Sequence, residues 1–135
     1  MTIPYEVEGD PRTYAILGAA MEVHSIVKRG FLESIYCHAL RIEFTARGIP
    51  FEIEVPCAVE YKGQRLGGLH HMDFVCYGGV VVEVKARSVL GPADQAQVLN
   101  YLAISGCTCA LLLNFGTPRL DYKRLVLGDA TDGNG

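Results

Sequence analysis

Residues 73–85 read Asp-Phe-Val-Cys-Tyr-Gly-Gly-Val-Val-Val-Glu-Val-Lys, and this stretch decides the fold. Apolar runs on either side of a Tyr-Gly-Gly turn predict two neighbouring strands, the first carrying an acid and the second an acid-x-base pair. Strands this rich in valine are typically covered on at least one face. An ionised carboxylate or ammonium is costly there unless it is paired or bound to a metal. We therefore expect the chemistry of the protein at this hairpin.

Asp73, Glu83 and Lys85 share one face of the sheet in only one hairpin register. Side chains alternate along a strand, so Glu83 and Lys85 project from the same face. Asp73 joins them if it pairs near Glu83, which requires a loop of odd length, Tyr77 to Gly79, with a glycine in the left-handed conformation. A tighter Gly-Gly turn would put Asp73 on the opposite face. We therefore predict the longer loop.

The other elements are predicted from capping residues, hydrophobic spacing and turns. Asp10 before Pro11 is typical of a helix start, and Gly30 of its end. A second helix is expected over about 32–47, and a third opens at Gly91-Pro92. Strands are expected at 51–61, bent near Pro56, and at 69–76, 80–86, 108–114 and 120–127, with a hairpin turn at 62–64. This order predicts an α/β fold with a mixed β-sheet flanked by helices, forming one domain over residues 1–127 with a flexible C-terminal tail at 128–135.

Length and composition bound the class of protein. A chain of 135 residues fits a single domain, and 50% hydrophobic with 20% charged residues is ordinary for a globular protein. The first residues lack a basic start followed by an apolar stretch, and no apolar run approaches membrane-spanning length, so we expect a cytoplasmic protein with no membrane partner. The five cysteines are irregularly spaced, which favours reduced thiols over a disulfide framework. With a net charge of −3, any nucleic-acid contact must use local basic groups or bound cations.

The acids at the hairpin suggest a metal site. Two carboxylates a few ångströms apart repel when both are ionised, which is relieved by raising one pKa or by a divalent cation between them. Oxygen-only ligands suit Mg²⁺ or Mn²⁺ rather than zinc, and such an ion can activate water and neutralise charge on a phosphoryl oxygen. Lys85 beside that water would stabilise the transition state. The alternative interpretation is an exposed Glu83–Lys85 ion pair with Asp73 as a solvated neighbour.

Three further polar residues favour the catalytic interpretation. Glu33 leads an apolar helical stripe at a position where leucine would be expected. Gln97 and Tyr101 share one face of the third helix at i, i+4 spacing, next to the sheet. The alternative for these residues is a capping acid and a surface amide and phenol.

The joint order of the motifs resembles the GxxExxY family of the PD-(D/E)XK nuclease superfamily. The segments that carry the resemblance are Gly30-Phe31-Leu32-Glu33-Ser34-Ile35-Tyr36, Asp73, Glu83-Val84-Lys85, Gln97-Val98-Leu99-Asn100-Tyr101 and Leu111-Leu112-Leu113-Asn114-Phe115-Gly116. The likeness extends from about Tyr14 to Val126. The chain departs from the superfamily pattern before Asp73, where His70, His71 and Met72 stand and a proline would be expected nearby.

The resemblance implies a restriction-endonuclease-like core and a single nuclease-like domain over residues 1–127. It implies a metal, Mg²⁺ or Mn²⁺, held by Asp73, Glu83, Glu33 and the Val84 carbonyl, with Lys85 positioning the attacking water. Gln97 and Tyr101 match the Q-x-x-x-Y element of RecB-like nucleases, which contacts substrate or orders the site. The implied function is metal-dependent hydrolysis of DNA or RNA, by analogy as a homodimer. The alternative is a nuclease-like module that binds nucleic acid or protein with little or no turnover.

Overall fold

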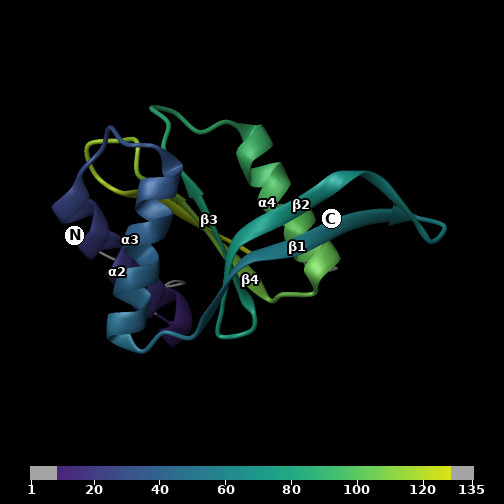
Figure 1. Ribbon diagram of the computed structural model, residues 1–135, viewed down its shortest axis with the longest axis horizontal. Helices are drawn as coiled ribbons and strands as arrows, with labels where there is room; N and C mark the ends of the chain where they lie inside the picture. The colour runs from purple at the N-terminus through teal and green to yellow at the C-terminus, as the bar shows by residue number, and fades with distance from the viewer. Residues whose placement is uncertain (1–8, 129–135) are drawn as a thin grey trace.

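The computed structural model describes residues 9–128, and within them the chain forms helices and strands in the predicted order (Figure 1). The elements are α2 (Pro11–Val27), α3 (Glu33–Arg47), β1 (Phe51–Tyr61), β2 (Gln64–Cys76), β3 (Val80–Lys85), α4 (Pro92–Ser105), β4 (Cys109–Asn114) and β5 (Asp121–Leu125). The C-terminal tail predicted at 128–135 lies, beyond Gly128, outside the described residues. No helix of the described part is long and apolar enough to cross a membrane.

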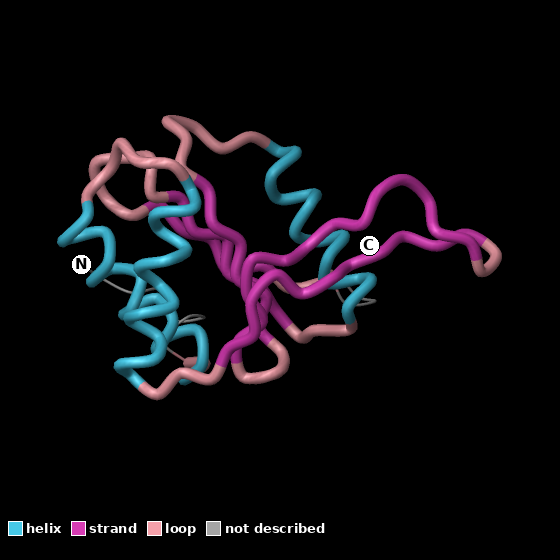
Figure 2. Tube along the Cα trace, in the orientation of Figure 1, coloured by secondary structure: helices cyan, strands magenta, loops and turns pink. Residues whose placement is uncertain are grey.

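The strands form one mixed sheet in the order β1-β2-β3-β4-β5. β3 and β4 run parallel and are joined through α4, whereas the other neighbouring pairs are antiparallel. One apolar core lies between the sheet and α2 with α3, and a second lies between the sheet and α4. Helices therefore cover both faces of the sheet, as Figure 2 shows, and the predicted restriction-endonuclease-like α/β architecture is confirmed.

Two boundaries differ clearly from those expected. The first helix ends at Val27 rather than at Gly30, because Lys28 leaves the helical conformation with a φ of 62°. β2 begins at Gln64 rather than at residue 69, because Lys62 and Gly63 alone make the turn, with φ values of 50° and 81° that suit a tight hairpin. Pro56 does not interrupt β1, since a missing N–H is tolerated on an edge strand. The pairing of β1 with β2 is irregular on both sides of Pro56: Glu54 has a φ of 49°, and the register shifts between Cys57 and Val59.

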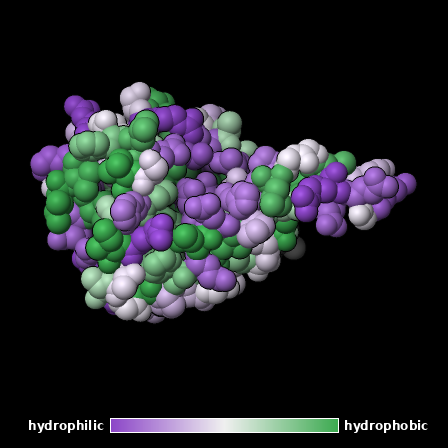
Figure 3. All heavy atoms as spheres, in the orientation of Figure 1, coloured by the Kyte–Doolittle hydropathy of each residue, from purple (hydrophilic) through white to green (hydrophobic). Residues whose placement is uncertain are grey.

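The distal halves of β1 and β2 leave the sheet as a long hairpin arm, residues 58–69 (Figures 1 and 2). All residues of the arm except Ala58 are exposed, including Val59, Tyr61, Leu66 and Leu69. Hydrophilic side chains cover its outer end in Figure 3. The arm begins beside the segment of β2 that carries Asp73.

An aromatic cluster fixes α3 against the sheet. Tyr36 stacks on Phe115 with 4.6 Å between ring centroids, and Phe44 meets Phe74 edge-on at 5.3 Å. Tyr36 and Phe44 lie on the apolar stripe of α3 and are fully buried, whereas Phe74 belongs to β2 and Phe115 follows β4. Because the stripe is anchored, the opposite face of the helix is held at a fixed position beside β1.

Candidate active site

The hairpin between β2 and β3 has the predicted register. Phe74 pairs with Val82 and Cys76 with Val80, which leaves Tyr77 to Gly79 as the loop. Gly78 has a φ of 66°, the left-handed conformation expected for a glycine there. One step further in this register, Asp73 lies opposite Glu83, so both side chains project from the same face of the sheet.

The carboxylates of Asp73 and Glu83 each accept a hydrogen bond from a main-chain N–H of the neighbouring strand. The N–H of Asp73 donates to Oε1 of Glu83 at 2.9 Å, and the N–H of Val84 donates to Oδ2 of Asp73 at 2.8 Å. These two bonds lie where the regular pairing of β2 with β3 has ended. The two carboxylates are therefore held next to each other by the strands themselves.

The protein compensates the ionised forms of the two carboxylates poorly. Glu83 is 4% exposed, and no cation among residues 9–128 forms an ion pair with it or with Asp73. Burial, reinforced by the charge of Asp73, raises the pKa of Glu83 to about 8. Burial also raises the pKa of Asp73; the charge of Glu33 adds to this shift, while the hydrogen bond from Val84 opposes it. At neutral pH the pair therefore retains a proton unless a cation takes its place.

Lys85 and two residues of α4 lie beside this pair. Lys85 projects from the same face as Glu83 and donates from Nζ to Oε1 of Gln97 at 3.1 Å. Tyr101, one turn further along α4, is 7% exposed, and its pKa is raised by burial and then by the charge of Glu83. The predicted i, i+4 pair thus lies beside the polar end of β3.

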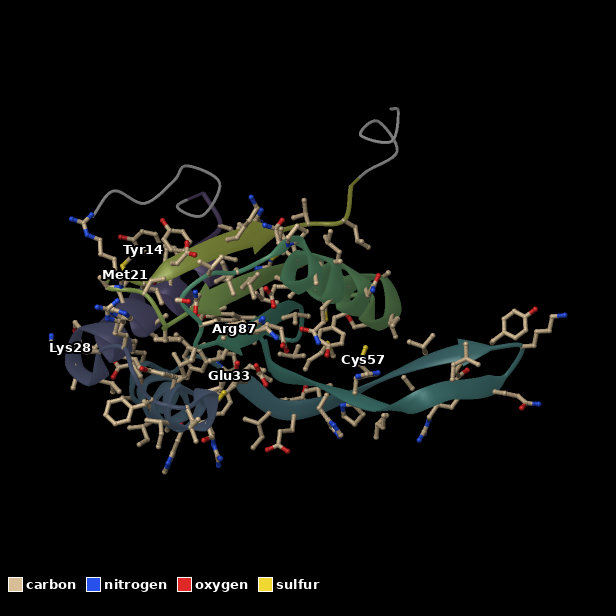
Figure 4. All side chains as sticks on the ribbon, turned by 90° about the horizontal axis from the view of Figure 1, so that it is seen from above. Tyr14, Met21, Lys28, Glu33, Cys57 and Arg87 are labelled. Atoms are coloured by element: carbon tan, nitrogen blue, oxygen red, sulfur yellow. The ribbon has the colours of Figure 1, made fainter. Side chains whose placement is uncertain are left out.

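Glu33 approaches from the opposite side. It is the first residue of α3, is exposed, and lines with Asp73 a groove of about 560 Å³ (Figure 4). Tyr36 positions it, because its hydroxyl donates to the Lys28 carbonyl at 2.6 Å and accepts from the Phe31 N–H at 3.2 Å. The Gly-x-x-Glu-x-x-Tyr segment is therefore a unit in which the buried tyrosine fixes the loop that leads to the glutamate.

The structure brings two of the predicted carboxylates together and holds the third across the groove. Among residues 9–128 no group of three or more His, Cys, Asp and Glu side chains is arranged to hold a metal ion. One oxygen of Asp73 and one of Glu83 each accept a hydrogen bond from a main-chain N–H. The donors nevertheless fit a hard divalent ion, because adjacent carboxylates with raised pKa values are what such a charge would stabilise.

Asn114 is a positioning residue to which the sequence analysis assigned no role. It is fully buried; its Oδ1 accepts from the Arg87 N–H at 3.0 Å, and its Nδ2 donates to the Arg87 carbonyl at 2.8 Å. Arg87 in turn pairs with the buried Asp94 at the start of α4. The available signal was an asparagine between the apolar run 109–113 and Phe115-Gly116. Its effect is to fix the segment that directly follows Lys85.

Comparison with known proteins agrees with this fold. No curated protein matches the sequence. Among solved structures, the chain resembles an alkaline exonuclease (LHK-Exo) from Laribacter hongkongensis, with a TM-score of 0.53 and 11% identity over 99% of this chain and 76% of that one. It also resembles SSO0001, with a TM-score of 0.51 and 20% identity over 94% of this chain and 60% of the other. The sequence model of the PD-(D/E)XK nuclease superfamily matches residues 10–125, and the chain therefore belongs to this superfamily.

Proposed function

We propose that the protein is a divalent-metal-dependent nuclease that hydrolyses phosphodiester bonds of DNA or RNA. One observation carries the proposal: the half-buried Asp73 and the buried Glu83 lie next to each other, and in the described part of the chain neither forms an ion pair, while Lys85 is the one ammonium beside them. When both carboxylates are ionised, one ammonium does not balance two negative charges. A bound cation would balance them, which favours its recruitment.

The residues that would hold the ion are Asp73, Glu83 and the Val84 carbonyl, with Glu33 reached across the groove. Oxygen donors of this kind select Mg²⁺ or Mn²⁺. When bound, such an ion supplies a water of lowered pKa and neutralises charge that develops on the phosphoryl group. Both carboxylates already have one oxygen fixed by a main-chain N–H, so their remaining oxygens are the available donors.

Lys85 is the residue that we assign to the attacking water. Its ammonium has three N–H donors, and one of them bonds to Gln97. The others can orient a water and stabilise the charge of the transition state. Gln97 holds the ammonium toward the site, and Tyr101 closes the side next to α4. This arrangement supports assigning Gln97 and Tyr101 to the Q-x-x-x-Y element of RecB-like nucleases.

The Gly30–Tyr36 segment supports placing the chain in the GxxExxY group of the superfamily. Tyr36 is buried and bonded to the loop, Glu33 faces the groove, and Gly30 has a φ of 115°, which a residue with a side chain rarely adopts. Each invariant type in the motif name therefore has a distinct physical role in this chain.

Cleavage assays with matched variants test the proposal. Single- and double-stranded DNA and RNA are incubated with the purified protein in Mg²⁺, in Mn²⁺ and in EDTA. Wild type is compared with Glu83→Ala and Lys85→Ala, and with Lys123→Ala as a control for a lost exposed lysine. The proposal predicts cleavage that needs the metal, is lost in the first two variants and persists in the third. If wild type cuts none of the substrates, yet binds nucleic acid as well as both site variants do, the chain is a nuclease-like binding module instead.

A further inference from the structure

The groove beside Asp73 continues along α3, and apart from Glu33 and Asp73 its residues have no role in the chemistry assigned above. Two hollows of about 560 and 570 Å³ share His38, Arg41 and Ile53 in their linings. We call them together the α3–β1 groove. One end holds Glu33 and Asp73, and the other holds Thr45 and Phe51. From Ser34 to Thr45 the helix wall is about 16 Å long, at 1.5 Å per residue.

The wall of this groove is the polar face of α3. Glu33, Cys37 and Arg41 recur at i, i+4 spacing, with Ser34 and His38 beside them, and all of them line the hollow that contains Asp73. The apolar face of the same helix is buried in the core. Because that burial fixes the helix, the polar side chains are presented to the groove as a preformed row.

Arg41 has a free guanidinium in this row. No carboxylate within residues 9–128 forms an ion pair with Arg41. The arginines that do pair with carboxylates are Arg12, Arg47, Arg87 and Arg124. His38 lies one turn before Arg41 on the same face, and His71 enters from β2. These are the cationic or protonatable donors of the groove, and Arg41 is the one that is always charged.

Both walls of the groove offer apolar surface to a ligand. Ile53 of β1 is 37% exposed, Ile42 of α3 is 62% exposed, and the half-buried Phe51 lies at the far end. Glu52 and Glu54 flank Ile53 and are the acidic members of the β1 wall. In Figure 3 hydrophilic side chains interrupt apolar ones between α3 and the start of the arm. Cationic groups beside apolar and aromatic surface are what single-stranded nucleic acid needs, with phosphates on one side and bases on the other.

We propose that the α3–β1 groove binds a single strand of nucleic acid, with Arg41 and His38 holding a phosphate next to the one that is cleaved. The inference rests on the proposed function, because it assigns the substrate of that site. A single strand is favoured over a duplex because Asp73, which lines the first hollow, is only partly exposed, and its neighbour Glu83 is almost completely buried, so the backbone must enter the hollow to reach this pair. Arg41 and His38 stand at the junction of the two hollows, where the chain leaving Asp73 must pass.

Binding is measured separately from cleavage. A fluorescent 12-nucleotide oligo-dT is titrated in Mg²⁺ with Glu83→Gln, which keeps the hydrogen bond from Asp73 but removes a charge that the chemistry needs. The substitution Arg41→Ala is added to this background and compared with Arg119→Ala, which removes an exposed arginine outside the groove. We expect Arg41→Ala to weaken binding about tenfold, the loss for one charged contact. It should also reduce the slope of log affinity against log salt by about 0.7, the value for one phosphate on a single strand.

The Arg119→Ala protein is expected to bind as its background does, and a blunt duplex of the same length is expected to bind more weakly than the single strand. The inference is overturned if the oligonucleotide does not bind, if both arginine variants lose the same affinity, or if the duplex binds better. In the active protein, Arg41→Ala should raise KM with little change in kcat. If cleavage is unchanged in Arg41→Ala, strand binding in the α3–β1 groove is contradicted and the proposed nuclease activity is not. If the oligonucleotide binds in the groove but wild type cleaves nothing, the proposed nuclease activity is contradicted and strand binding in the groove is not.

Discussion

The main-chain N–H of Asp73 donates to the buried carboxylate of Glu83 at 2.9 Å, so the strand that carries one acid orients the other. Glu83 reaches this position because the Tyr77–Gly79 loop sets the register. The bond favours the ionised form, but burial outweighs it and raises the pKa of Glu83 to about 8. Ionising Glu83 in the folded protein therefore lowers the free energy of unfolding, by an amount that depends on pH.

That cost predicts how Glu83→Gln changes stability. In the unfolded chain Glu83 ionises near its ordinary pKa of 4.5, whereas in the folded protein it keeps its proton up to about 8. Between these two pKa values the folded state binds more protons than the unfolded state. The stability that Glu83 contributes through its proton is therefore full below the unfolded pKa of 4.5 and is lost as pH rises through the folded pKa of about 8. Urea unfolding in EDTA should show wild type losing up to about 1.4 kcal/mol per pH unit between pH 6 and 8 relative to Glu83→Gln. Parallel pH profiles for the two proteins would contradict the raised pKa.

Lys85 and Gln97 should affect the rate differently. Lys85→Ala removes a donor that acts on developing charge, so we expect single-turnover cleavage to fall roughly 100-fold or more with the metal still bound. Gln97→Ala leaves the ammonium in place without its 3.1 Å partner, and a loss of about tenfold is expected. If the double variant loses the product of the two single losses, Gln97 acts independently of Lys85, which would contradict this assignment.

The hydroxyl of Tyr36 should stabilise the loop before Glu33. Tyr36→Phe keeps the ring stacked on Phe115 but leaves the Lys28 carbonyl and the Phe31 N–H without this partner. We expect a loss of about 1–3 kcal/mol in the free energy of unfolding, measured by urea denaturation. Tyr61→Phe on the exposed arm is the matched control and should change stability little. No difference between the two variants would mean that the buried hydroxyl does not hold the loop.

Gly116 should tolerate no side chain. A Cβ there would lie 2.3 Å from the Arg87 nitrogen, in the segment that Asn114 clamps. We expect Gly116→Ala to cost about 3 kcal/mol, because rigid main chain must move. Gly68→Ala, where a Cβ meets nothing within 4 Å, is the control for the loss of a glycine. Thermal melts that coincide for both variants would contradict the close approach.

Much of the fold could be predicted because its signals are local. The caps of α2 and α4, the apolar stripe of α3 and the alternation in β3 each depend on a few neighbouring residues. The register of Asp73 with Glu83 also followed from local geometry, since the loop length alone decides which face a side chain occupies. The start of β2 was missed because the arm has no buried face to impose alternation on residues 64–68.

The site could be predicted less fully because its distances are set by tertiary packing. Sequence spacing does not say how far Glu33 stands from the sheet; the stacking of Tyr36 on Phe115 decides that. The clamp from Asn114 to Arg87 joins residues 27 positions apart. Arg41 and Ile53 become neighbours only when β1 turns back along α3, so the groove between them leaves no pattern in the sequence.

Calorimetric titration of Mn²⁺ into the metal-free protein tests the central assignment most directly. Wild type is compared with Asp73→Asn and with Asp121→Asn, an exposed aspartate on β5. We predict one binding site in wild type and in Asp121→Asn, weakening as pH falls below about 8 because protons compete for Glu83, and lost in Asp73→Asn. Binding to Asp73→Asn that equals binding to wild type, or no binding by wild type at pH 8, would contradict the assignment of these two carboxylates to a metal.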